Sequence, residues 1–113
     1  MDLEFDVVPA ESVSRAEALA VFDANNPGGL LESAPGVRVA LSIELQESAG
    51  YVPDIIAVVL TIPAGVAADL IASWLVRILK GKAKAIVVDR TIIELDEERI
   101  VRVIQERIHA EEE

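Results

Sequence analysis

The chain has 113 residues, of which 20 are acidic and 10 basic, a formal net charge of −10, and no cysteine. This length fits one domain that can bury a core, and the lack of cysteine excludes disulfides, thiolate metal sites and cysteine nucleophiles. The excess of acids argues against nucleic acid and anionic lipid as main partners, because both are bound through lysine and arginine. A secretory signal needs a basic start, whereas this N-terminus is acidic, so we expect a cytoplasmic protein.

The first part of the chain combines strand and helix patterns. Residues 3–8 alternate apolar with acidic side chains, which predicts a half-buried strand. Ser14 and Glu17 have the spacing of a capping box, which predicts a helix over residues 15–25 that ends at Asn-Asn-Pro-Gly-Gly. Residues 28–36 are expected to form a loop. Residues 37–46 alternate most clearly and predict a second strand.

The most apolar stretch follows, with the sequence IIAVVLTIPAGVAADLIASWLVRILKGK at residues 55–82. Residues 54–61 fit a strand, since isoleucine and valine favour strands, and they also fit a helix that Asp54 would cap. Pro63 either kinks a long helix or opens a new one. A helix is predicted from Ala64 to Lys80, with Gly81 as its stop.

The C-terminal part predicts a hairpin and a final helix. Residues 85–88 and 91–95 are rich in β-branched side chains and are separated by Asp89-Arg90, which predicts a turn between two strands. Asp96 would cap the last helix, and residues 109–113 would be a frayed tail. The apolar stripe of this helix is formed by Ile100, Val103, Ile104 and Ile108.

No catalytic motif is recognisable in the sequence. His109 is the single histidine, no serine lies in a nucleophile elbow, and the glycines form no phosphate-binding fingerprint. Asp54 and Asp69 are the acids nearest to apolar surroundings, and we interpret them as a helix cap and as part of a polar helix edge. We therefore expect no enzyme, no cofactor and no metal site.

The predicted helix over residues 64–80 carries the candidate interaction residues. Asp69, Ser73 and Arg77 are spaced four apart and form a polar strip, opposite a wide apolar face. An alanine row at the same spacing would let a partner approach closely. The candidate residues are Ala64, Val66, Ala68, Asp69, Leu70, Ala72 and Trp74. In a monomer the same apolar residues would be ordinary core, and the sequence leaves these alternatives open.

The motifs GVAADLIASWL (residues 65–75), the basic turn from Lys80 to Lys84, and the hairpin IVVDRTIIEL together resemble the effector-associated constant component family. These are small proteins of bacterial conflict systems that accompany caspase-like or trypsin-like effectors. The resemblance covers about half of the chain and implies an adaptor without catalytic residues. It also implies that residues 54–61 are helical, and we adopt that interpretation.

These observations predict a single α+β domain over residues 1–113, with about four mostly antiparallel strands and three or four helices on one face of the sheet. The expected function is a protein-interaction module that binds itself, as a homo-oligomer, or an effector in bacterial defence or signalling. One alternative is a small membrane-active effector that inserts residues 55–79. Another is an acidic immunity-type inhibitor of a basic toxin, which the net charge of −10 would suit.

Overall fold

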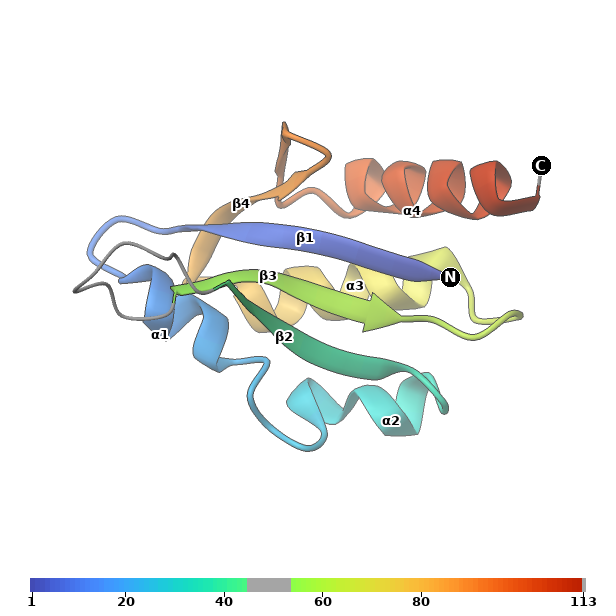
Figure 1. The fold of residues 1–113 in the computed structure, drawn as a ribbon, viewed down its shortest axis with the longest axis horizontal. Helices are drawn as coiled ribbons and strands as arrows, with labels where there is room; N and C mark the ends of the chain where they lie inside the picture. The colour runs from blue at the N-terminus through green and yellow to red at the C-terminus, as the bar shows by residue number, and fades with distance from the viewer. Residues whose placement is uncertain (45–53, 113) are drawn as a thin grey trace.

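The computed structural model describes residues 1–44 and 54–112, with the side chains of residues 1–41 and 58–110. The strands form one antiparallel five-stranded sheet in the order β2-β3-β1-β4-β5 (Figure 1). This confirms the predicted α+β class, with a slightly larger sheet than expected. The elements are β1 (Asp2–Pro9), α1 (Arg15–Ala20), the 3-10 helix η1 (Pro27–Gly29), α2 (Leu30–Ser33), β2 (Arg38–Glu44), β3 (Asp54–Thr61), α3 (Ala68–Leu79), β4 (Ala83–Val88), β5 (Thr91–Glu94) and α4 (Glu97–Glu112).

The order of strands and helices up to β4 is that of the split βαβ, or ferredoxin-like, arrangement, and β5 and α4 extend it at the C-terminal end. The central strand β1 pairs with a different neighbour along each half. Its residues 2–5 pair with β3, and its residues 6–9 pair with β4. The ammonium group of Met1 continues the first pairing by donating a 2.9 Å hydrogen bond to the carbonyl oxygen of Ile62.

The core lies between the sheet and the helices on one side of it, as predicted. In Figure 1, α3 passes behind β1 and β3, and α4 runs beside α3. A line of aromatic rings joins the layers: Phe5 of β1 contacts Phe22 edge-on at 5.7 Å, and Phe22 contacts Trp74 of α3 in the same way at 5.9 Å. Ile100 and Ile104 of α4 complete the buried cluster on the helical side.

The helical interpretation of residues 54–61 is wrong, because this segment forms β3. Burial alternates along its described side chains, with Val58 and Leu60 fully buried and Thr61 exposed, which is the period of a strand. β3 pairs with β2 on one side and β1 on the other. Asp54 is therefore the first residue of a strand and caps no helix.

Helix α3 begins at Ala68, four positions later than predicted. Pro63 follows the strand, and Gly65 has a φ of 91°, which a right-handed helix cannot contain. The helix ends at Leu79 and is followed by Gly81 with a φ of 80°, so the predicted stop is confirmed. Residues 55–79 are thus divided between a strand, a loop and a short helix. Within the described ranges, no helix is long and apolar enough to cross a membrane.

Other predictions are confirmed in part. The Ser14 hydroxyl accepts a hydrogen bond from the Glu17 amide at 3.1 Å, which confirms the helix start, but α1 ends at Ala20 instead of residue 25. The expected loop at 28–36 contains the short helix α2. β2 covers most of the predicted strand, of which residues 45 and 46 lie outside the described residues.

The C-terminal hairpin is confirmed, and its turn has an unusual composition. Asp89 and Arg90 have φ values of 50° and 66°, the two positive angles of a type I′ turn. The carboxylate of Asp96 accepts a 2.9 Å hydrogen bond from the Glu98 amide, which confirms the predicted cap of α4. Helix α4 extends to Glu112, so the residues expected to form a frayed tail are helical up to that position.

Candidate interaction surface

Two of the seven candidate interaction residues, Trp74 and Ala72 of α3, are buried inside the chain. Trp74 is 2% exposed and Ala72 is fully buried. The indole Nε1 of Trp74 donates a 2.7 Å hydrogen bond to the carbonyl oxygen of Pro27, and the guanidinium of Arg77 donates one of the same length to Gly28. Trp74 therefore anchors η1 to α3 and is not accessible to a partner in this conformation.

The remaining candidate residues of this region lie at the N-terminal end of α3. Ala64 and Asp69 are exposed, Leu70 is 44% exposed, and Val66 and Ala68 are partly buried. The predicted polar strip is confirmed, since Asp69, Ser73 and Arg77 are all exposed. The alanine row is interrupted, because Ala64 precedes the helix. The structure thus brings together five of the seven candidates at the surface and places the other two in the core.

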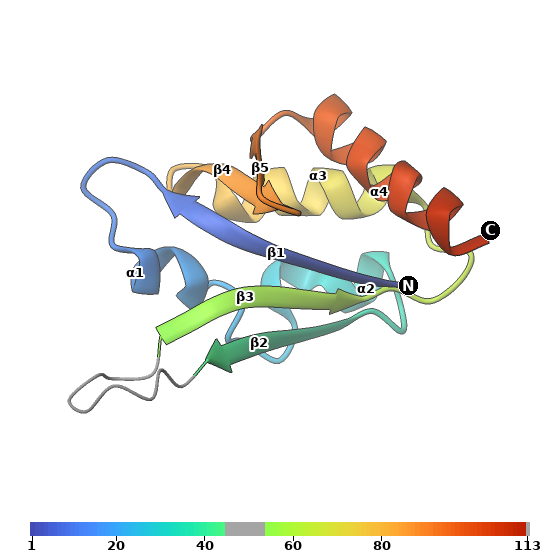
Figure 2. The same cartoon turned by 45° about the horizontal axis from the view of Figure 1, so that its top comes forward.

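A second and larger surface is the side of the sheet opposite the core, which we call the open face. Alternation along each strand and the pairing registers assign its residues, and no helix passes over β1 or β3 in Figure 2. Helix residues reach it at its rim, where Arg15 of α1 pairs with Asp6 and Arg99 of α4 lies 4.0 Å from Glu94. The open face consists of Asp2, Glu4, Asp6 and Val8 of β1, Arg38 and Ala40 of β2, Val59 and Thr61 of β3, Ala85 and Val87 of β4, and Ile92 and Glu94 of β5.

The open face carries an acidic strip between aliphatic side chains. Asp2, Glu4 and Asp6 follow one another along the central strand. Asp6 is paired with the guanidinium of Arg15 at 2.7 Å, whereas Asp2 and Glu4 are exposed. Toward β5 the register places Asp6, Val87 and Ile92 in one row, and Ile92 is 68% exposed. This arrangement offers negative charge and apolar area side by side.

Sequence reasoning missed Ile92 as a surface residue. In a hairpin, successive side chains point to opposite faces, and the register pairs Ile93 with Ile86 on the core side and Ile92 with Val87 on the other. Two adjacent isoleucines in a short hairpin strand were therefore a signal that one of them would face away from the core.

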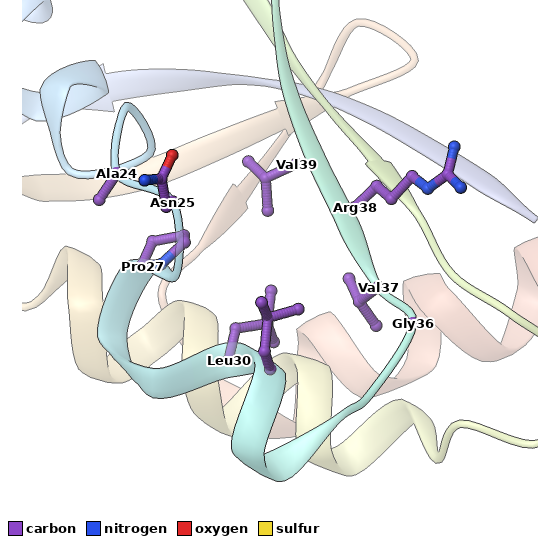
Figure 3. A pocket seen from close by; sticks show the side chains of 9 residues that line it. Ala24, Asn25, Pro27, Leu30, Gly36, Val37, Arg38 and Val39 are labelled. Carbon is purple, nitrogen blue, oxygen red and sulfur yellow. The ribbon is translucent and has the colours of Figure 1, made fainter.

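A hollow of about 520 Å³ lies beside the sheet's outer strand β2 (Figure 3). One wall comes from the segment that connects α1 to α2 and from α2 itself, with Leu30 and Leu31. The other comes from β2 and the residue before it, with Val37 and Val39. Leu31 is 42% exposed and Val39 is partly exposed. The hollow is thus a recess in which Leu31 and Val39 lie beside the polar Asn25 and Arg38, along the edge of β2 that pairs with no described strand.

The described part of the chain contains no cluster of histidine, cysteine and carboxylate side chains that could hold a metal ion. Comparison with protein-family models, with curated proteins and with solved structures finds no significant match.

Proposed function

We propose that the chain is a non-enzymatic protein-interaction module that docks on a partner protein through its open face. The observation that carries this proposal is the exposure of aliphatic side chains on the open face, above all Ile92 at 68%. Apolar side chains in such a position contribute little to the stability of the chain itself and gain free energy when a partner removes them from water.

The charge of the open face defines the chemistry of the partner. Asp2 and Glu4 are exposed on the central strand, and the whole chain has a net charge of −10. A partner with lysine or arginine around an apolar centre would be attracted over a distance and then held by burial of Ile92 and Val87. We propose a basic protein surface as the occupant of the open face.

The resemblance to the effector-associated constant components supports an effector of a bacterial defence or signalling system as that partner. The lack of cysteine fits the cytoplasm, which we propose as the compartment. The acidic strip also favours a second candidate function at the same surface, namely inhibition of a basic toxin. In that case, binding would lower the activity of the partner, whereas an adaptor would leave it unchanged or raise it.

The proposal is tested with a photo-crosslinking amino acid at position 59 on the open face and, as a control, at position 106 on α4. A partner captured only from position 59 is purified, and its Kd is measured for the unmodified chain and for variants. We expect Ile92→Asp to weaken binding by about tenfold or more, and Glu4→Lys to weaken it most at low salt.

Leu70→Asp is the matched control, because it introduces the same charge on the surface that the sequence predicted at the start of α3. If Leu70→Asp weakens binding and Ile92→Asp does not, the partner docks on α3 and the open face is the wrong surface. Equal affinity of all variants would contradict both surfaces.

A further inference from the structure

We propose that two copies of the chain associate through their β2 strands and form one continuous antiparallel sheet. This inference goes beyond the proposed function, since it concerns the edge of the sheet and leaves the open face accessible. β2 is the outermost strand and has β3 as its only neighbour in the sheet of described residues. Its other edge therefore presents backbone donors and acceptors, which a further strand satisfies.

The sequence of β2 is complementary to itself when read in the opposite direction. Its seven residues are Arg-Val-Ala-Leu-Ser-Ile-Glu, from Arg38 to Glu44. In an antiparallel pair centred on Leu41, position 38 lies opposite position 44 of the second copy, so that a base meets an acid at both ends. Valine then lies opposite isoleucine, alanine opposite serine, and Leu41 opposite itself.

The geometry of a two-fold pair selects this register. Each residue must lie opposite one of the same face, which requires the two position numbers to have an even sum. Among these registers, centring on Leu41 is the one that pairs all seven positions of β2, and it is also the one that matches Arg38 with Glu44. The register between β2 and β3 shifts after Ser42, where β3 contains the additional residue, so β2 itself continues without interruption.

The hollow beside β2 supplies the apolar part of the interface. It flanks the N-terminal half of β2, at Val37 and Val39 (Figure 3). In the proposed register, position 43 of the second copy, an isoleucine, lies opposite Val39 at the mouth of this hollow. By symmetry, the hollow of the second copy receives the C-terminal half of the first strand. The partly exposed Val39, Leu41 and Leu31 are then covered in both copies.

The other edge strand does not offer the same fit. β5 contains only four residues, Thr91 to Glu94. A two-fold pair centred on Ile92 brings Glu94 opposite Arg90, which belongs to the turn before the strand, and one centred on Ile93 brings it opposite Ile92. Short edge strands are one way in which proteins avoid edge pairing. The length of β2, all of whose seven positions are paired in the proposed register, therefore singles it out.

The first test is light scattering on a sizing column at about 0.15 M salt, where repulsion between the acidic chains is screened beyond about 8 Å. At chain concentrations up to about 100 µM we expect twice the mass of 12.2 kDa. Arg38→Glu and Glu44→Arg each create two like-charge pairs per dimer, and we expect each to raise the dimer Kd by about tenfold or more. The double variant restores the pairs and the dimer. Arg102→Glu, at an exposed position of α4, is the control and is expected to leave the mass unchanged.

A cysteine scan tests the register, because the chain has no cysteine of its own. Leu41→Cys places two thiols directly opposite each other and is expected to form a disulfide-linked dimer on oxidation, since such pairs have Cβ atoms about 4.5–5.5 Å apart. Ala40→Cys is the matched control and stays unlinked, because position 40 faces position 42. Circular dichroism confirms that both variants are folded.

A chain that remains monomeric at all concentrations overturns the proposal. A dimer that persists in both charge variants, or one that Ala40→Cys links in preference to Leu41→Cys, also overturns it, because the copies then meet elsewhere or in another register. All of these outcomes are measured on the chain alone, without a partner, although Arg38 and Ala40 also belong to the open face. The affinity for a captured partner, measured with Ile92→Asp, is thus a separate result, and the two proposals fail independently.

Discussion

Trp74 is the residue for which a core role and an interface role predict different outcomes. Its side chain is 2% exposed, contacts Phe22 edge-on, and donates a hydrogen bond to Pro27 that fixes η1 on α3. Truncation to alanine leaves a cavity that costs about 3–5 kcal/mol and a buried carbonyl oxygen without its donor, for about 1–3 kcal/mol more. Because domains of this size have about 5–15 kcal/mol of stability, Trp74→Ala is expected to be largely or fully unfolded.

Trp74→Phe makes the prediction quantitative. Phenylalanine keeps the aromatic contact and most of the volume but cannot donate to Pro27, so we expect a loss of about 1–3 kcal/mol in the free energy of unfolding. The measurement is urea denaturation followed by circular dichroism. Leu70→Ala is the control in the same helix, where a side chain that is 44% exposed should cost less than about 1 kcal/mol. If Trp74→Ala denatured at the same urea concentration as Leu70→Ala, Trp74 would not be a core anchor.

Four further substitutions test other positions by the same denaturation measurement. Gly28→Ala would place a Cβ atom 2.4 Å from Ile78 Cγ2, and the residue has a φ of 60°, which strains any residue with a Cβ atom. We expect this variant to cost about 2–4 kcal/mol. Gly81→Ala, where no atom lies within 4 Å of the added Cβ, should cost only about 1 kcal/mol. Equal losses of stability in the Gly28 and Gly81 variants would mean that the contact with Ile78 does not add to the cost. Arg90→Gly should stabilise the chain by about 1 kcal/mol, because a non-glycine residue there has a φ of 66°; a loss of stability would contradict this. Ser14→Ala removes the 3.1 Å cap of α1 and should cost about 1 kcal/mol, whereas no change would mean that the cap is not formed in solution.

Local signals in the sequence were sufficient for much of the fold. The capping box at Ser14, the cap at Asp96 and the hairpin around Asp89 each depend on residues that are close in the chain, and the structure confirms all of them. The alternation of residues 3–8 also identified β1, because one of its faces is buried and the other is not.

The prediction of a helix over residues 54–61 was wrong for a physical reason. A short run of isoleucine and valine fits both a buried helix and a strand, and only its neighbours decide. Here β3 lies between β2 and β1, a long-range pairing that no local pattern encodes. The open face could not be predicted for the same reason, since its residues come from five strands and meet only through the sheet.

The divided pairing of β1 has a consequence for how the chain folds. Strand β1 has both of its strand partners, β3 and β4, much later in the sequence, and the Met1 amine bonds with a residue 61 positions away. Loops of this length must close before β1 gains either of its strand partners, so folding should be slow for a chain of this size. A chain shortened before β4 would leave residues 6–9 of β1 without a neighbour, and the two halves of the sheet therefore form and unfold as one cooperative unit.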